Sequence, residues 1–185
     1  MNQILPISAN ILGFSGSIGS GKSTLSVELA GRINYKYASF GNYVRKIATR
    51  MGCIDPSRAQ LQGIGETLVE NGARKFCISV LQDAEWLQGE GLIVDGIRHL
   101  DTLELISKIC QPQKMFLIYI TVDEGIRRER LISRGRDNEL ASTLKHSTEL
   151  QAKEILRSKA DLVIDGSKKV DDNLQRIIAW LATKI

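Results

Sequence analysis

Short apolar runs alternate with stretches of helical spacing along most of this chain. The apolar runs predict five strands, at residues 11–12, 37–40, 92–94, 115–122 and 162–164. Those at 92–94 and 115–122 are apolar throughout, which is typical of parallel strands covered by helices on both faces. The alternation predicts a single domain over residues 1–185, with a three-layer α/β fold around a five-stranded, mostly parallel sheet.

The segments between the predicted strands carry apolar residues three or four positions apart. Leu25, Leu29 and Ile33 form one such face after the first strand. Later helices are expected to bury residues 103, 105, 106 and 109, and then Leu174, Ile177, Ile178 and Leu181. Residues 140–159 are also expected to be helical.

Three successive helices within residues 41–88 interrupt this alternation. Their expected inward faces are Val44, Ile47, Ala48 and Met51; Leu61, Ile64 and Leu68, after a capping Ser57; and Ala73, Phe76, Cys77, Val80 and Ala84. An all-helical insertion after the second strand is a suitable place for an acceptor-binding subdomain that moves against the core.

A glycine-rich turn joins the first strand to the first helix. From Gly16 to Ser23 it has a Gly, four free positions and then Gly-Lys-Ser, the pattern of a phosphate-binding loop. Its glycines let backbone N–H groups point inward at phosphate oxygens, and the start of the helix completes an anion cradle. Lys22 can reach the β- and γ-phosphates of ATP, and Ser23 can offer its hydroxyl to Mg²⁺. The expected ATP-binding residues are Gly16, Ser17, Ile18, Gly19, Ser20, Gly21, Lys22, Ser23 and Thr24.

The alternative for this stretch is a flexible linker rich in glycine and serine. A linker would not have an apolar strand before it, an amphipathic helix after it and Lys-Ser at the junction, so the pattern favours nucleotide binding. The loop is the most specific signal in the sequence, and the other motifs gain weight mainly from their order.

The third predicted strand ends in Asp95-Gly96-Ile97-Arg98. In parallel sheets ligands gather at the carboxyl ends of the strands, so Asp95 is expected beside the phosphate-binding loop. Its carboxylate can orient Mg²⁺-bound water or accept a proton from an attacking hydroxyl, while Arg98 is placed to hold a phosphate. An ordinary Asp-Gly turn with a surface arginine is the alternative, and the neighbouring loop favours the functional interpretation.

The chain becomes strongly basic after the fourth strand, where residues 126–136 read IRRERLISRGR. Three of these arginines are spaced to share a helical face: Arg127, Arg130 and Arg134. Arg136 follows just after them. We expect a short lid around residues 127–140 whose guanidinium groups close over the transferring phosphate and stabilise its charge in the transition state. The alternative is a solvated basic helix in which Glu129 and Asp137 pair with some arginines.

Composition agrees with one enzyme domain that handles anionic ligands. The chain has 185 residues, 43% of them hydrophobic, and a formal net charge of +4. Lysine and arginine are not massed in a run, which favours a phosphorylated small molecule as partner over nucleic acid. Cys53, Cys77 and Cys110 lack the paired spacing of a disulfide framework or a zinc site. We find no apolar run of membrane-spanning length and no signal peptide, so we expect a cytoplasmic protein; its oligomeric state stays open.

Taken in order, these motifs resemble those of the nucleoside and nucleotide monophosphate kinases over nearly the whole chain. The matching stretches are Gly16–Thr24, Gly41–Arg45, Asp95–Arg98, Arg130–Asp137 and Ala160–Ser167. Within that superfamily the chain resembles the adenylate-kinase-like proteins and, through Arg58–Glu66, the deoxynucleotide monophosphate kinases. The stretch Ala160–Ser167 is similar also to that of dephospho-coenzyme A kinases.

The resemblance implies transfer of the γ-phosphoryl group of ATP, with Mg²⁺, to the phosphate of a nucleoside monophosphate. The expected catalytic residues are Lys22, Asp95, Arg130 and Arg134. Arg130 is also expected to bind ATP, and Ser23 and Asp95 are expected to bind the metal ion. The expected acceptor-binding residues are Gly41, Arg45, Arg98 and Arg136.

Two departures from the family pattern lie on the acceptor side. Ile97 alone separates Asp95-Gly96 from Arg98, where adenylate kinases have a further residue and a proline. Lys145 followed by His146 stands where the family's post-lid helix usually offers an arginine. The sequence therefore defines the phosphate donor better than the phosphate acceptor. A hydroxyl compound such as a nucleoside or dephospho-coenzyme A is an alternative acceptor, and Asp95 would then take the proton of its hydroxyl.

A regulatory switch or a nucleic-acid-stimulated ATPase is the alternative from another functional class. A GTPase switch motif needs glycine where this chain has Arg98. The stretch Ser158–Asp161 looks like a guanine-binding motif but precedes an apolar strand instead of following one. Turnover of ATP with nucleoside monophosphates, compared with turnover with DNA or RNA, distinguishes these classes.

Overall fold

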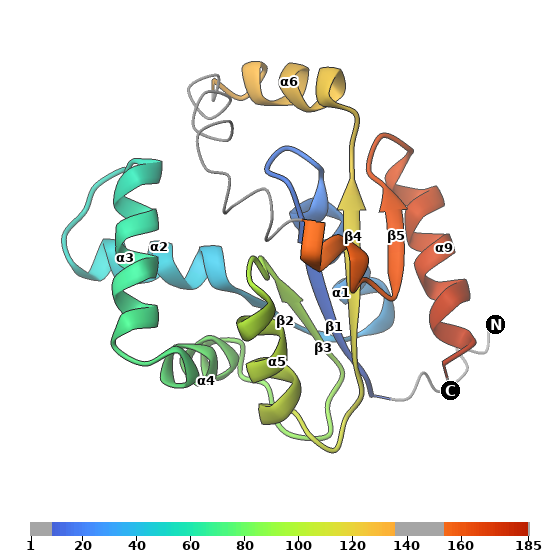
Figure 1. Ribbon diagram of the computed structural model, residues 1–185, viewed down its shortest axis with the longest axis horizontal. Helices are drawn as coiled ribbons and strands as arrows, with labels where there is room; N and C mark the ends of the chain where they lie inside the picture. Colours follow the sequence, from blue (N-terminus) through green and yellow to red (C-terminus); the bar gives the residue numbers. More distant parts are fainter. Residues whose placement is uncertain (1–8, 136–153, 185) are drawn as a thin grey trace.

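Five parallel strands form one sheet at the centre of the computed structural model, which describes residues 9–135 and 154–184 (Figure 1). In chain order the strands are β1 (Ile11–Gly16), β2 (Lys36–Ser39), β3 (Leu92–Asp95), β4 (Met115–Thr121) and β5 (Leu162–Asp165). They lie in the order β2-β3-β1-β4-β5, and every neighbouring pair is parallel. The predicted α/β fold is confirmed.

Helices follow the strands, except where three of them interrupt the alternation. They are α1 (Lys22–Ile33), α2 (Phe40–Arg50), α3 (Arg58–Glu70), α4 (Ala73–Asp83), α5 (Leu100–Ile109), α6 (Glu124–Ile132) and α9 (Val170–Ala182). Residues 154–158 are helical as well. The predicted helical insertion is formed by α2, α3 and α4, which lie at the β2 side of the sheet (Figure 1).

Two hydrophobic cores lie on opposite faces of the sheet. Neighbouring residues of β1 point to opposite faces, so Ile11 packs in one core and Leu12 in the other. The first core includes residues of α2, α4 and α5, and the second includes residues of α1 and α9. Because helices cover both faces, β3 and β4 are hydrophobic up to their polar last residues, Asp95 and Thr121, and the result is the three-layer arrangement.

The strand register brings the carboxyl ends of the strands to one edge of the sheet. Asp95 at the end of β3 is the partner of Phe14 in β1 and of Ser39 in β2. Gly16 at the end of β1 is the partner of Ile120 in β4. Neighbouring strands are about 4.8 Å apart, so the turns after these strands begin close together. Beyond the carboxyl end of β4 lies α6 (Figure 1).

The structure corrects two details of the predicted helical insertion. Phe40, predicted to end the second strand, begins α2, because the Ser39 side chain caps the helix by accepting from the Asn42 N–H at 3.3 Å. Met51, predicted on the buried face of that helix, is 67% exposed because it is the C-cap residue, beyond the last helical turn. The buried residues of α2 are Phe40, Val44 and Ala48.

The insertion is packed most loosely at α3. Ser57 begins this helix with the predicted cap, accepting from the Gln60 N–H while its own N–H donates to Gln60 Oε1. None of the side chains of α3 is fully buried, although Leu61 and Ile64 pack partly against the core. An ion pair at 2.8 Å between Lys46 and Asp83 joins α2 to α4. The outermost helix is therefore the one with the least support from packing.

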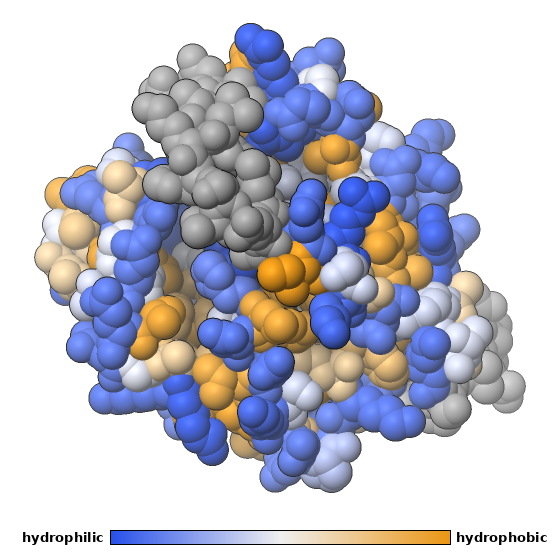
Figure 2. All heavy atoms as spheres, viewed as in Figure 1, coloured by the Kyte–Doolittle hydropathy of each residue, from blue (hydrophilic) through white to orange (hydrophobic). Residues whose placement is uncertain are grey.

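Some predictions fall on the chain outside the described residues. They concern Arg136, the end of the predicted lid, Lys145 and His146, and residues 140–153 of the predicted helix. Among the helices that the structure describes, we find none long and apolar enough to cross a membrane. Hydrophilic side chains cover most of the face shown in Figure 2, with hydrophobic ones in groups among them.

Candidate active site

The phosphate-binding loop runs from the end of β1 to the start of α1. Gly16 lies so close to β4 that a Cβ would be 2.5 Å from the carbonyl oxygen of Ile120, which excludes a side chain there. Gly21, with φ +90°, is the N-cap of α1 and offers the first turn no side-chain acceptor. The N–H groups at the start of α1 have no side-chain cap, which suits an anion at this helix end.

The predicted loop residues differ in their access to a ligand. Lys22, the first residue of α1, is partly exposed, and Ser23 and Thr24 are exposed. Ser17, Ile18 and Gly19 are partly exposed. Ser20 is fully buried, and within the described part of the chain its Oγ has no hydrogen-bond partner. The side chains expected to meet the phosphates and the metal therefore lie on the open side of the loop.

Ser23 and Asp95, 72 positions apart in the chain, meet at this loop. The Ser23 hydroxyl donates to Asp95 Oδ2 at 2.7 Å. Asp95 is only 4% exposed, and its second oxygen, Oδ1, is buried without a hydrogen-bond partner among the described residues. An unpartnered buried carboxylate oxygen is costly unless a ligand satisfies it. A hydroxyl and a carboxylate are both suitable oxygen donors toward a hydrated Mg²⁺, so the pair fits this ion.

Tyr37, which the sequence did not single out, completes this group. Its hydroxyl donates to Asp95 Oδ2 at 3.0 Å, so that oxygen accepts from both Tyr37 and Ser23. Burial, and then the nearby charge of Asp95, raises the pKa of Tyr37 to about 12, and the phenol is therefore protonated at neutral pH. In the sequence Tyr37 is only an aromatic residue in a short strand. Its contact depends on the pairing of β2 with β3, for which the sequence carries no direct signal.

Arg130 on α6 bridges the phosphate-binding loop and the turn after β5. Its Nη1 donates to the carbonyl oxygens of Gly19 at 3.5 Å and Ser20 at 3.4 Å, and its Nη2 donates to that of Gly166 at 2.9 Å. Gly166 itself approaches the loop so closely that a Cβ would be 2.2 Å from the Ser20 carbonyl oxygen. Arg130 thus lies beside the loop, as expected. Its hydrogen bonds to backbone carbonyls hold the loop against the turn after β5.

A cavity of about 210 Å³ opens beside the phosphate-binding loop on the β4–β5 side. Its lining includes Gly21 and Thr24 of the loop, the arginines Arg130 and Arg134, and Lys168 after β5. A larger hollow of about 350 Å³ lies between α5 and the start of β4, but it contains no residue of the phosphate-binding loop. We therefore include the smaller cavity in the candidate site, since the loop and two arginines line it, although Ser23 and Asp95 lie outside its lining.

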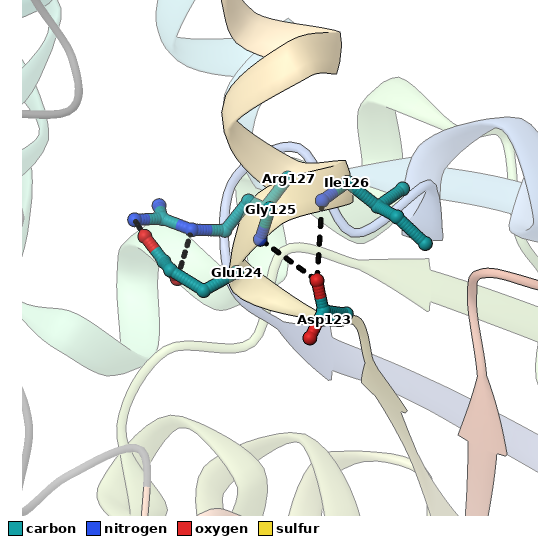
Figure 3. Close-up of polar contacts among 5 residues, drawn as sticks. All are labelled: Asp123, Glu124, Gly125, Ile126 and Arg127. Atoms are coloured by element: carbon teal, nitrogen blue, oxygen red, sulfur yellow. Dashed lines mark hydrogen bonds and ion pairs between the residues drawn. The ribbon is translucent and has the colours of Figure 1, made fainter.

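Arg127 differs from the two arginines that line the cavity. At the start of α6, Asp123 accepts from the Gly125 and Ile126 N–H groups, and Glu124 accepts from Arg127 Nε at 2.8 Å (Figure 3). Arg127 is 4% exposed and packs on the phosphate-binding loop. Arg127 therefore faces the loop from α6, as Arg130 does and as the spacing predicted, but its guanidinium pairs with Glu124 and it does not line the cavity. Arg134 lies in the turn after Ile132, where α6 ends.

Gly41 and Arg45, expected on the acceptor side, lie near the turn after β3. A Cβ on Gly96 would be 3.9 Å from the Gly41 nitrogen, so this turn and the start of α2 are neighbours. Arg45 is exposed, and its Nη1 donates to Asn42 Oδ1 at 3.2 Å. Arg98 is exposed in the same turn after β3. The structure thus brings these residues to the β2–β3 side of the loop, away from α6 on the β4–β5 side.

Comparison with known sequences gives relatives that span most of the chain. A family model described as an AAA domain matches residues 12–157. A UPF0200 protein of Pyrobaculum aerophilum is 29% identical over 174 residues, which cover 91% of this chain and 94% of that protein. An adenylate kinase of Synechococcus sp. is 25% identical over 138 residues, which cover 72% of this chain and 73% of that protein.

Solved kinase structures share the fold at low sequence identity. A shikimate kinase from Bacteroides thetaiotaomicron has a TM-score of 0.58 and 16% identity, covering 94% of this chain and 98% of that one. A gluconokinase from Sinorhizobium meliloti has a TM-score of 0.56 and 14% identity, covering 95% and 93%. At such identities the likeness shows the fold alone. The family model covers most of the described chain, so the protein belongs to the AAA domain family and has the fold of the P-loop kinases.

Proposed function

We propose that this protein is an ATP-dependent phosphotransferase that moves the γ-phosphoryl group to the phosphate of a nucleoside monophosphate. The observation that carries the proposal is the 2.7 Å hydrogen bond from Ser23 to Asp95, which joins the phosphate-binding loop and the strand-end carboxylate in one site. Proteins of this fold include shikimate kinase and gluconokinase, so the acceptor has to be argued from side chains.

The donor side would consist of the loop, the start of α1 and α6. Lys22 and the uncapped N–H groups of α1 would bind the phosphates of ATP, and Arg130 and Arg134 would face them from the β4–β5 side. Ser23 would hold Mg²⁺ with its hydroxyl, and Asp95 would orient the metal's water through Oδ1. Bound Mg²⁺ supplies positive charge that neutralises the β- and γ-phosphate oxygens. Positioning and charge would then provide most of the rate enhancement.

The exposed charge of Arg45 supports the proposal that the acceptor carries a phosphate. Arg45 is exposed near the turn after β3, and within the described residues its only side-chain partner is the neutral amide of Asn42. Because no described carboxylate pairs with this guanidinium, its charge can bind a phosphate without breaking an ion pair. A phosphate acceptor is also largely ionised near neutral pH, so the site needs no strong base to activate it.

A hydroxyl acceptor, such as a nucleoside or dephospho-coenzyme A, is the second candidate. The observation that favours it is the unpartnered Oδ1 of Asp95, which could accept the proton of an attacking hydroxyl. The proton would pass from the hydroxyl to Oδ1 as the new P–O bond forms and the bond between the γ-phosphorus and ADP breaks.

An acceptor panel tests these proposals. The rate of ADP formation would be measured with each ribo- and deoxynucleoside monophosphate, with dephospho-coenzyme A, shikimate and gluconate, and with DNA or RNA. We expect a nucleoside monophosphate to raise the rate well above that of ATP alone. Stimulation by dephospho-coenzyme A or another hydroxyl compound alone would replace the first candidate with the second, and stimulation by nucleic acid alone would exclude both.

A further inference from the structure

We propose that Tyr37 is a positioning residue for the metal site: by donating to Asp95 Oδ2, it holds the carboxylate so that Oδ1 is left for a water molecule of hydrated Mg²⁺. This inference rests on the proposed function, because it assumes that Mg²⁺ and ATP bind at Ser23 and Asp95. It adds a residue of β2 to a site otherwise formed by the phosphate-binding loop and β3.

The sheet register explains why Tyr37 reaches Asp95. Tyr37 and Ser39 are two positions apart in β2, so their side chains lie on the same face of the sheet. Ser39 is the register partner of Asp95 in β3, and Asp95 therefore shares that face. One two-residue step along a strand is about 6.6 Å, which a tyrosine side chain can span. The result is the 3.0 Å hydrogen bond between Tyr37 and Asp95.

A second donor is needed because one hydrogen bond does not fix a carboxylate. The torsion that rotates the carboxylate of an aspartate has broad minima, so with Ser23 alone the carboxylate plane of Asp95 could turn and move Oδ1 away from the metal's water. Ser23 would also be engaged by the metal through its oxygen, while its proton continues to point at Oδ2. Tyr37 has no such second task. Outer partners of this kind orient metal ligands, and their removal typically weakens metal binding or activity.

Packing is the competing explanation for Tyr37, since its ring lies partly buried against the core that contains α1. Tyr37→Phe separates the two roles, because it keeps the ring and removes only the hydroxyl. Tyr35→Phe is the matched control. Tyr35 packs partly buried against the same core, but its hydroxyl accepts from the Asn10 N–H at 3.4 Å, and its ring lies beside Gly91.

The test measures metal binding without turnover. Mg²⁺ is titrated by calorimetry into each protein saturated with a non-hydrolysable ATP analogue, and thermal unfolding checks the fold. We expect Tyr37→Phe to weaken Mg²⁺ binding by about ten- to a hundredfold. Binding of the analogue in EDTA should be the same as in wild type, and Tyr35→Phe should bind Mg²⁺ as wild type does.

Asp95→Asn separates failure of this inference from failure of the proposed function. If Asp95→Asn loses Mg²⁺ affinity while Tyr37→Phe keeps the wild-type value, the positioning role is overturned and the proposed metal site stands. If the analogue-saturated wild-type protein binds no Mg²⁺, the proposed function fails and this inference fails with it. Equal losses in Tyr37→Phe and Tyr35→Phe would assign the effect to packing and would also overturn the inference.

Discussion

Single residues decide how closely the loops of the candidate site approach one another. At Gly166 the turn after β5 comes closest to the phosphate-binding loop. A Cβ there would be 2.2 Å from the Ser20 carbonyl oxygen and 3.0 Å from that of Thr121, both of them backbone atoms. We predict that Gly166→Ala lowers the free energy of unfolding by about 1–3 kcal/mol, the usual range for overpacking. It should also weaken ATP binding, since the turn and the loop share Arg130. Denaturant unfolding and ATP titration measure the two effects.

Gly63→Ala is the control for that variant. Gly63 lies within α3, and a Cβ there would meet nothing within 4 Å. Alanine should stabilise this helix by up to about 1 kcal/mol and leave ATP binding unchanged. If Gly166→Ala matched the wild type in both stability and ATP affinity, the close approach of the turn to the loop would be wrong.

Arg45 carries a prediction about the acceptor side. Because Arg45 lies on α2 and the donor cradle lies at the start of α1, Arg45→Ala should weaken acceptor binding far more than ATP binding. Arg50→Ala, at the exposed last turn of the same helix, should change neither. Calorimetric titration with each ligand makes the comparison. Equal losses for acceptor and ATP in Arg45→Ala would mean that the acceptor site is misplaced.

Residue type and order in the sequence were enough to predict that Asp95 lies beside the loop residue Ser23, because the phosphate-binding loop and the strand-end aspartate are local patterns. The contact between them could then be expected from the edge of a parallel sheet. Tyr37 could not be found in this way, since its hydrogen bond depends on which strands pair and in which register. The burial of Arg127 could not be predicted either, because spacing alone does not show that its guanidinium forms an ion pair with Glu124.

Among the elements, α6 and the turn after it hold the arginines that we expect to act as a lid over the transferring phosphate. Arg130 already contacts the carbonyls of Gly19 and Ser20, so we predict that Arg130→Ala weakens ATP binding and also lowers kcat. Arg134 lines the cavity from the turn after α6, and Arg134→Ala should lower kcat more than it weakens ATP binding. Arg128→Ala, exposed on the same helix, is the control and should match wild type.

Steady-state kinetics with independently measured ATP affinity decide whether these arginines act in the transition state. A lid that excludes water should also suppress ATP hydrolysis, so hydrolysis should form a larger share of the remaining turnover in Arg134→Ala. Wild-type kcat in both arginine variants would remove the lid from the mechanism and leave α6 with a structural role only, through the contacts of Arg130 with the loop.

Most helices and strands could be predicted because their apolar spacing is regular and their caps are local. Ser57 and Gly72 precede α3 and α4 as expected. The errors fall at element ends, where local hydrogen bonds decide: Ser39 caps α2 one residue earlier than the apolar pattern indicated, and Met51 lies past the end of that helix. Side-chain capping of this kind competes with hydrophobic periodicity, and periodicity alone does not show which prevails.

For the whole molecule, the alternation of strands and helices was enough to predict the layered parallel sheet. The strand order β2-β3-β1-β4-β5 sets which loops are neighbours, and it separates the α2 side of the site from the α6 side. The acceptor is harder to predict, because kinases acting on chemically different acceptors share this fold. In the proposed function, donor binding would depend on one local loop, whereas acceptor choice would depend on side chains from several separate elements.

We propose that the protein binds ATP at the Gly16–Thr24 loop and transfers its γ-phosphoryl group to a monophosphate acceptor. ATP labelled at its γ-phosphorus is incubated with the acceptor panel and either wild type or Lys22→Ala, and the labelled products are separated. We predict label in the β-position of a nucleoside diphosphate with wild type. Transfer by Lys22→Ala should be slower by at least about a hundredfold, close to 3 kcal/mol of transition-state stabilisation, with unchanged thermal unfolding. Label found only in inorganic phosphate with every acceptor, or transfer by Lys22→Ala at close to the wild-type rate, would contradict the claim.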